Sequence, residues 1–188
     1  MILASASPRR ARILERLEIP FRVVVTEVDE TPLPGEGGAA LAERLARAKA
    51  AAVADHDGLP VLAADTTVVC GEVLLGKPNS LEEARAMLRM LSGRSHDVVT
   101  GVCAARAGRL LSAVDVTGVT FGPLSEIEID WYVATGEPMG KAGAYHIDGR
   151  GGLFVTSISG SPSNVAGLPI PLARRLLREL GVAIPAGL

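Results

Sequence analysis

The stretch "VLAADTTVVC", residues Val61–Cys70, predicts the central strand of the fold. It is apolar and rich in β-branched side chains, as is typical of a strand buried on both faces. Asp65 interrupts this run, and a buried carboxylate is costly unless it is paired, hydrogen-bonded or bound to a metal. We therefore expect Asp65 to act as a metal ligand or general base. The structural alternative is a strand-end Asp whose oxygens accept from local N–H groups.

Strands and helices alternate on both sides of this strand. Before it, the patterns predict a strand at Met1–Ala4, a helix at Pro8–Leu17, a strand at 21–25 and a helix from about Ala39 to Asp55. After it, they predict a short strand at 72–76, a helix at Leu81–Leu91, a hairpin of Ser95–Ala105 with Leu110–Thr120, a helix at Glu126–Ala134, a strand at Leu153–Ser159 and a helix at Pro171–Leu180. Capping boxes at Ser80 with Glu83 and at Ser125 with Glu128 open two of these helices. The hairpin interrupts the alternation, so we predict an α/β fold with a mixed sheet flanked by helices.

Composition restricts the class of protein. A chain of 188 residues, 48% hydrophobic and 21% charged with a net charge of −2, fits one globular domain over 1–188 and excludes disordered and fibrous classes. No apolar run approaches the roughly 20 residues that cross a bilayer, and the beginning of the chain lacks a signal-peptide pattern, so we expect no membrane partner and a cytoplasmic location. Cys70 and Cys103 lie in apolar runs and are expected to be reduced core residues.

The charge and the aromatic content argue against a nucleic-acid partner. The chain is mildly acidic and has only three Phe, two Tyr and one Trp for stacking on bases. A small anionic substrate needs only a local cluster of positive charge, so that class of ligand stays open.

The stretch "SASPRR" supplies such a cluster. Ser5, Ser7 and Pro8 are typical of a helix start, but Arg9 and Arg10 follow at once, where the helix dipole disfavours positive charge. A phosphate bound at this helix N-terminus would turn that conflict into attraction. Lys49 in "LARAKAAA" and Lys77 in "GKP", two of the three lysines, are further candidates for contacting phosphate.

Acidic residues offer ligands for a metal. Asp65 can be joined by Glu27, Asp29 or Glu30 from the acidic loop "TEVDETPLPGEGG". Carboxylates without His or Cys partners suit Mg²⁺ or Mn²⁺ better than zinc. Carboxylates for a divalent metal, together with Arg and Lys for phosphate oxygens, are what chemistry on a triphosphate requires. The chain has neither a "GxxxxGK[ST]" nor a "GxSxG" motif, which excludes the P-loop and nucleophile-elbow mechanisms.

Eight stretches from Leu3 to Pro169 resemble, in their order and spacing, the Maf family (septum formation protein Maf) of nucleoside triphosphate pyrophosphatases. They are "LASASPRR", "VDE", "LARAKA", "AADTTV", "GKP", "SGRSHDVVTG", "WYVATGEPMGKAGAYHIDGRGG" and "ISGSPSNVAGLP". The resemblance implies an elongated, two-lobed α/β fold related to inosine triphosphate pyrophosphatase, with the nucleotide in a cleft between the lobes. It also implies a homodimer, the assembly in which the family is often found.

The resemblance further implies cleavage between the α and β phosphates, which gives a nucleoside monophosphate and pyrophosphate. Asp65 would be the proton acceptor that activates water, with a divalent cation, Mg²⁺ or Mn²⁺, shared with Glu30. The positions that match the family's phosphate-binding residues are Ser5, Arg9, Arg10, Lys49 and Lys77. Two further functions remain open on the residues alone: a nucleotide-binding regulator of septum formation with incidental hydrolysis, and a nucleotidyl transferase.

By the same resemblance, the residues expected to determine substrate choice are Arg9, Thr66 and Asp148. Members resembling dTTP/UTP pyrophosphatases have Gln where this chain has Asp148. A carboxylate accepts hydrogen bonds but cannot donate them as an amide does, so the preferred base is left unassigned. Glu137 and Lys141 also match the family pattern, and a salt bridge that shapes the Gly-rich loop explains them as well as catalysis does. For His96 we expect a structural hydrogen bond.

Overall fold

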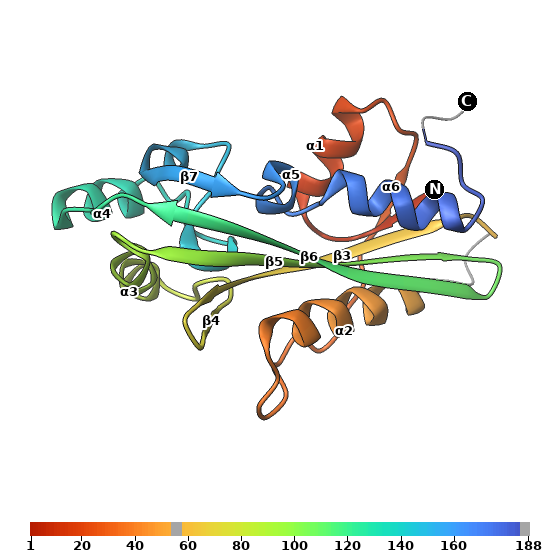
Figure 1. Ribbon diagram of the computed structural model, residues 1–188, viewed down its shortest axis with the longest axis horizontal. Helices are drawn as coiled ribbons and strands as arrows, with labels where there is room; N and C mark the ends of the chain where they lie inside the picture. Colours follow the sequence, from red (N-terminus) through yellow and green to blue (C-terminus); the bar gives the residue numbers. More distant parts are fainter. Residues whose placement is uncertain (54–57, 185–188) are drawn as a thin grey trace. The chain divides into compact units, whose positions relative to one another are not determined.

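The computed structural model describes residues 1–53 and 58–184 (Figure 1). In chain order its elements are β1 (Ile2–Ala4), α1 (Pro8–Arg16), β2 (Arg22–Val24), α2 (Gly38–Ala51), β3 (Val61–Cys70), β4 (Val73–Leu75), α3 (Leu81–Leu91), β5 (Ser95–Arg106), β6 (Arg109–Phe121), α4 (Glu126–Ala134), the 3₁₀ helices η1 (Ala142–Ala144) and η2 (Arg150–Phe154), β7 (Val155–Ser159), α5 (Pro162–Val165) and α6 (Ile170–Glu179). The predicted α/β class is confirmed, and the central strand has its predicted bounds.

Seven strands in the described ranges form one mixed sheet. The order is β2-β1-β3-β5-β6-β7, and β4 pairs with β3. β1 runs parallel to β2 and β3, whereas β4 is antiparallel to β3 and β7 is antiparallel to β6. The predicted hairpin joins β5 to β6, and its two turn residues, Ala107 and Gly108, have φ of 48° and 74°. Positive φ at both central positions is the geometry of a type I′ hairpin turn.

The chain divides into two compact units. Unit 1 comprises Met1–Asp65, Thr100–Asp115 and Gly167–Leu188, and unit 2 comprises Thr66–Val99 and Val116–Ala166. In unit 1, α2 covers one face of the sheet, and α1 and α6 cover the other (Figure 1). The α2 face is lined by small side chains such as Ala46 and Ala50, which pack on Val61 and Ala63. Small residues at this contact let the helix lie close to the sheet.

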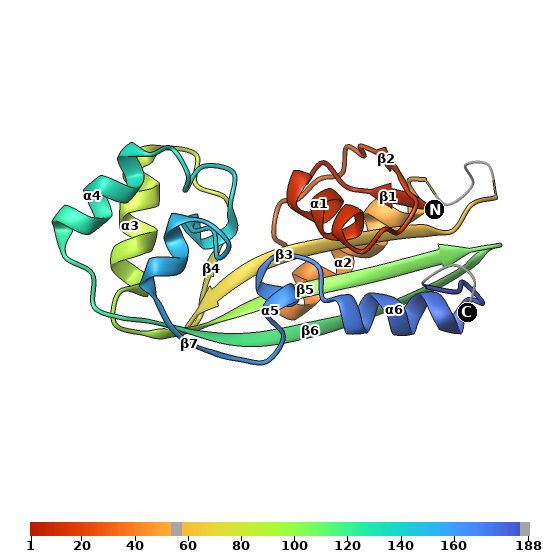
Figure 2. The ribbon, with the colours of Figure 1, turned by 90° about the horizontal axis from the view of Figure 1, so that it is seen from above.

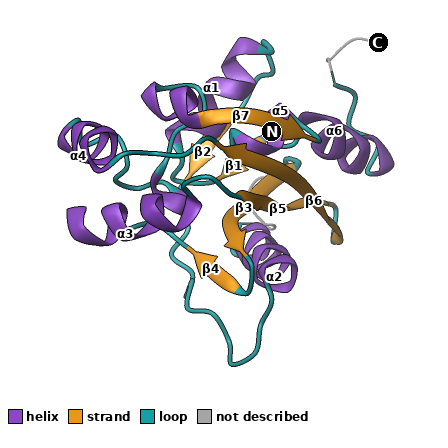
Figure 3. Ribbon diagram, turned by 60° about the vertical axis from the view of Figure 1, so that its left-hand side comes forward, coloured by secondary structure: helices purple, strands orange, loops and turns teal. Residues whose placement is uncertain are grey.

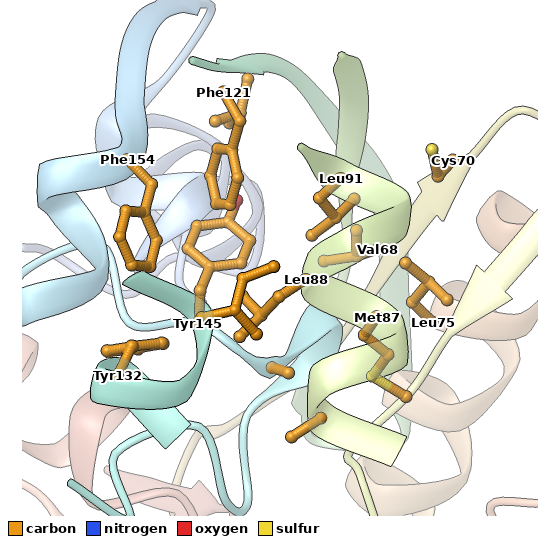
Figure 4. Packing of buried hydrophobic residues seen from close by; sticks show 14 of the residues in the cluster. Val68, Cys70, Leu75, Met87, Leu88, Leu91, Phe121, Tyr132, Tyr145 and Phe154 are labelled. Carbon is orange, nitrogen blue, oxygen red and sulfur yellow. The ribbon is translucent and has the colours of Figure 1, made fainter. Parts of the chain in front are cut away.

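Unit 2 has its own hydrophobic core, which Figure 4 shows from close by. Leu88 and Leu91 of α3 pack there with aromatic residues that include Phe121, Tyr145 and Phe154. The rings of Phe121 and Tyr145 meet edge to face, with centroids 4.9 Å apart. α3 and α4 lie side by side in this unit (Figure 2). The two units therefore each bury an apolar core.

Several predicted boundaries need correction. The predicted strand at Leu153–Ser159 begins only at Val155, because residues 150–154 form η2. A short helix, α5, lies between the strand predicted at Leu153–Ser159 and the helix predicted at Pro171–Leu180. The capping box of Ser125 and Glu128 is confirmed. Of the box predicted for Ser80 and Glu83, only the hydrogen bond from the Glu83 N–H to Ser80 Oγ is present. The Glu83 carboxylate accepts instead from the Asn79 N–H, at 2.8 Å. The predicted helix end at Asp55, and His56, lie outside the described residues.

The connection from β2 to α2 is drawn as loop throughout in Figure 3. It carries the acidic residues for which a metal-binding role was predicted. Among residues 1–53 and 58–184, no helix is both long and apolar enough to span a membrane.

Candidate active site

The carboxyl end of β1 and the middle of β3, which run parallel, bring the first site residues together in unit 1. The register pairs Ala4 of β1 with Ala63 of β3. Ser5 follows directly after β1, and Asp65 lies two residues beyond Ala63. Both are buried. In open α/β sheets, ligands bind at this edge of the sheet, where parallel strands end.

Lys49 and Asp65 meet on the α2 face of the sheet. Because side chains alternate along a strand, Asp65 shares a face with Val61 and Ala63, which pack against α2. The Lys49 ammonium reaches from α2 and donates to Asp65 Oδ1 at 2.5 Å. It also donates to Glu30 Oε1 at 2.6 Å. The structural alternative for Asp65 was a pairing with local N–H groups; its partner here is a cation from another element.

Glu30 is the acidic-loop residue that reaches this point. Its side chain is half exposed, whereas Lys49 is 7% and Asp65 is 9% exposed. Among the described residues, no group of three or more His, Cys, Asp or Glu could hold a metal ion. The two carboxylates for which a metal-binding role was predicted, Glu30 and Asp65, each contact the Lys49 ammonium with one oxygen. Such hard oxygen donors, completed by water and phosphate oxygens, fit Mg²⁺ or Mn²⁺.

The same helix holds the loop that carries Glu30. Arg44 of α2 donates to both carboxylate oxygens of Glu36, at 2.7 and 2.8 Å, and to the Thr31 carbonyl at 3.0 Å. The hydrogen bonds from Arg44, with one from the Leu33 N–H, lower the pKa of Glu36 to about 2. Asp29 accepts from the Thr31 N–H at 2.9 Å. Arg44 thus ties the loop on either side of its turn to α2.

The two arginines at the start of α1 have different environments. Arg10 is buried, and it donates from Nε to the Gly167 carbonyl at 2.7 Å and from Nη1 to Ser5 Oγ at 3.2 Å. Burial lowers the pKa of Arg10 to about 10, although attraction to Asp65 and Glu30 opposes that shift. Arg10 is therefore charged at neutral pH. Arg9 is half-buried.

Ser5, rather than Ser7, provides the hydroxyl at this helix start. Ser5 Oγ accepts from the Ser7 N–H at 3.1 Å as well as from Arg10. The first turn of α1 contains no acidic residue. The N-terminus of α1 therefore presents a helix dipole together with a buried guanidinium, an arrangement suited to an anion.

The three remaining candidates belong to unit 2. Thr66 directly follows Asp65 in β3 and projects to the opposite face of that strand. Lys77 is exposed in the loop after β4, and Asp148 is exposed in the turn before η2. Their proposed roles stay predictions.

Comparison with known proteins identifies the family. A family model described as Maf-like protein matches residues 1–180. The chain belongs to the Maf family. A Myxococcus xanthus (strain DK1622) protein named dTTP/UTP pyrophosphatase is 53% identical, over 98% of this chain and 94% of that protein. A protein of the same name from Symbiobacterium thermophilum is 50% identical, over 100% of this chain and 97% of that protein.

A solved structure agrees with the fold of this Maf-family chain. The Ham1 protein of Staphylococcus aureus aligns with a TM-score of 0.52, at 16% identity, over 95% of this chain and 96% of that chain. At this identity the likeness concerns the fold alone. It agrees with the predicted mixed α/β fold.

The Gly-rich stretch that matches the Maf family is organised by Glu137. The Glu137 Oε1 atom accepts from the Gly151 N–H and from the Tyr132 hydroxyl, both at 3.0 Å, and Arg150 lies 3.7 Å from Oε2. Although burial opposes it, hydrogen bonds from the backbone of Gly151 and Arg150 lower the pKa of Glu137. Lys141, proposed as the salt-bridge partner, donates to the Met139 carbonyl at 3.0 Å. Arg150 is thus one ion-pair partner of Glu137.

His96 has the structural hydrogen bond that was expected. Its Nε2 lies 3.0 Å from the Tyr145 hydroxyl, and its ring packs edge to face against Phe121. Burial lowers the pKa of His96 to about 4. Nδ1 is buried without a hydrogen-bond partner among the described residues. His96 is therefore neutral at physiological pH.

Three residues that shape the site escaped the sequence patterns. Arg44 and Glu36 are eight positions apart, on a helix and in a loop, and no local spacing rule links such a pair. Gly101 on β5 lies against the backbone of α2. A glycine within an apolar strand was the one available signal for such a close approach.

Proposed function

We propose that this protein hydrolyses a nucleoside triphosphate to a nucleoside monophosphate and pyrophosphate, with Asp65 as the proton acceptor. The observation that carries the proposal is the joint contact of Lys49, on α2, with Glu30 and with Asp65 in the middle of β3. Maf-family membership and the names of relatives at about 50% identity support the reaction class.

Positive groups of unit 1 would bind the triphosphate. Arg10 and the N-terminus of α1 offer buried charge and a helix dipole, and Ser5 adds a hydroxyl. We also propose phosphate-binding roles for Arg9, Lys49 and Lys77. Arg fits phosphate with its planar fork, whereas Lys acts as a point charge on a flexible stem.

Asp65 would orient a water and accept its proton. As the water oxygen bonds to the α-phosphorus, the bond between that phosphorus and the bridging oxygen breaks, and pyrophosphate leaves with the electron pair. Glu30 and Asp65 would hold the metal. When bound, Mg²⁺ or Mn²⁺ supplies charge neutralisation for the phosphate oxygens. Holding water and phosphate in one orientation lowers the entropic part of the barrier.

The substrate base is the finer part of the proposal. Two relatives are named for dTTP and UTP, so these are the first substrates to test. We assign base discrimination to Arg9, Thr66 and Asp148. Because Asp148 is a carboxylate, it favours groups on the base that donate hydrogen bonds. A cytoplasmic location and a homodimer remain predictions.

A panel of natural and modified triphosphates tests this function. We expect pyrophosphate release from at least one of them, dependent on Mg²⁺ or Mn²⁺, with the monophosphate as coproduct. Free monophosphate formed without an acceptor would exclude nucleotidyl transfer. Slow turnover of every substrate beside tight binding would contradict the proposal and favour the nucleotide-binding regulator.

A further inference from the structure

Lys49 occupies the place where its two carboxylate partners converge. Its ammonium nitrogen is 2.6 Å from Glu30 Oε1 and 2.5 Å from Asp65 Oδ1. The Lys49 and Asp65 side chains are both largely buried, so water screens this contact weakly. The pair of carboxylates proposed to hold a metal thus already holds a cation of the protein itself.

The two carboxylates cannot bind both cations without a cost. Ligands of Mg²⁺ lie at about 2.1 Å. A dication that shared either contacted oxygen with the ammonium would lie within about 5 Å of the ammonium nitrogen, and like charges this close repel strongly where water is largely excluded. Divalent metal and the Lys49 ammonium therefore compete for these two carboxylates.

Local charge makes the ammonium the favoured occupant when no nucleotide is bound. Glu30 and Asp65 bring two carboxylates, and Lys49 and Arg10 bring two cations that attract both of them. Arg9 lies near Arg10 and Arg44 near Asp65, so a dication alone would add two positive charges to carboxylates that already have several cations around them. A triphosphate brings about four negative charges at neutral pH, and its oxygens can accept the displaced ammonium.

We propose that Lys49 is an internal counter-cation that competes with divalent metal for Glu30 and Asp65. Metal then binds weakly to the free protein and tightly together with the triphosphate. This inference rests on the proposed function, because it takes the two carboxylates as the metal ligands. It gives Lys49 two successive partners, the carboxylates first and the phosphate oxygens afterwards.

The exchange is confined to the lysine side chain. The α2 backbone lies directly against β5, where a β-carbon at Gly101 would stand 2.2 Å from the Ala42 carbonyl oxygen. The helix has no room to shift toward the strand at that point. The four-carbon stem of Lys49 can instead rotate its ammonium away from the carboxylates.

Mn²⁺ binding in the absence of nucleotide tests the competition directly. We expect Lys49→Met to bind Mn²⁺ about tenfold tighter than the unmodified protein, as measured by electron paramagnetic resonance of free Mn²⁺. Arg47→Met is the matched control, because it removes the same charge from an exposed position of α2 whose side chain contacts Ser112. Lys49→Arg keeps a cation and should bind Mn²⁺ as weakly as the unmodified protein. Unchanged or weaker binding by folded Lys49→Met would overturn the inference.

A second measurement on the unmodified protein covers the case in which Lys49→Met does not fold. Water-proton relaxation distinguishes Mn²⁺ on the protein from Mn²⁺ chelated by free nucleotide. The α,β-methylene analogue of UTP should raise the affinity of the protein for Mn²⁺ about tenfold or more, and by reciprocity Mn²⁺ should raise the affinity for the analogue equally. A ratio near one would overturn the inference.

The two proposals fail in different ways. If the unmodified protein releases pyrophosphate from a triphosphate but Lys49→Met binds Mn²⁺ no tighter, the counter-cation role falls and the enzymatic function stands. If Lys49→Met binds Mn²⁺ tighter but the unmodified protein hydrolyses no triphosphate, the competition between Lys49 and metal stands and the proposed enzymatic function falls.

Discussion

Gly101 of β5 lies in direct contact with Ala42 of α2. A β-carbon at Gly101 would be 2.2 Å from the Ala42 carbonyl oxygen and 2.5 Å from the Glu43 amide nitrogen. Both obstacles are backbone atoms, so no side-chain rotation could relieve the clash. This contact fixes how deeply α2 sits on the sheet, and α2 carries both Lys49 and Arg44.

Gly101→Ala should push α2 away from the sheet and withdraw Lys49 from Asp65. We expect a loss of about 1–3 kcal/mol in the free energy of unfolding, as for other overpacked sites, and a fall in the rate of pyrophosphate release. Denaturant unfolding and a pyrophosphate assay measure the two effects. Gly118→Ala on β6 is the control, because the nearest atom to its new β-carbon would be 3.8 Å away. Equal effects of both substitutions would show that the contact with α2 is unimportant.

Arg44→Lys should release the loop that carries Glu30. An ammonium cannot reproduce the two parallel hydrogen bonds that the guanidinium makes to Glu36. We expect about a tenfold loss in affinity for Mn²⁺ or in kcat/KM, the size seen when groups that position metal ligands are removed, with little change in melting temperature. Glu82→Gln, which disturbs two exposed ion pairs of unit 2, should leave the Mn²⁺ affinity and kcat/KM unchanged. An unaffected Arg44→Lys enzyme would show that the loop holds Glu30 without this clamp.

Pyrophosphate should stabilise the native protein through the start of α1. Its effect on the melting temperature should weaken in Arg9→Ala and in Arg10→Ala, because both remove positive charge from the proposed phosphate site. Arg10→Ala should also cost about 1–3 kcal/mol without ligand, since it leaves the Gly167 carbonyl without its donor. Thermal unfolding with and without pyrophosphate separates the effects. Full ligand stabilisation in both variants would remove this turn from the phosphate site.

Stability should fall as acid protonates the unfolded form of His96. Its native pKa is lowered to about 4 from an ordinary value of 6.5, so the unfolded chain binds more protons between these two pH values. The free energy of unfolding should therefore drop by about 1.4 kcal/mol per pH unit from pH 6.5 down to pH 4, and no further below it. Tyr145, whose hydroxyl contacts the ring, has its pKa raised by burial and stays neutral in that range. His96→Gln should remove this part of the slope in denaturant unfolding, and an identical slope would contradict a buried neutral His96.

Local patterns predicted the elements that local physics determines. The bounds predicted for the strand Val61–Cys70 are correct at both ends, because a run of β-branched apolar side chains strongly favours a buried strand. Ser125 and Glu128 marked the start of α4, since a capping box uses neighbours only three positions apart. The predicted start of the last strand at Leu153 was wrong. Leu153 is apolar but exposed, and it belongs to η2 rather than to β7.

The sequence patterns singled out residue types but not their pairings. Asp65 in an apolar strand and Arg10 at a helix start each conflict with their local element unless they have a partner, whereas Lys49 drew attention as one of only three lysines in the chain. Which cation meets which carboxylate depends on the depth of α2 and on the loop held by Arg44. Both are set by contacts distant in sequence, for which a single chain offers no spacing rule.

Pyrophosphate release by Asp65→Asn tests the central claim most directly. The amide has nearly the shape of the carboxylate but cannot accept the proton of the attacking water. We expect turnover of every triphosphate to be abolished while circular dichroism and the unfolding transition still report a folded protein. Pyrophosphate release at close to the unmodified rate by folded Asp65→Asn would contradict the account.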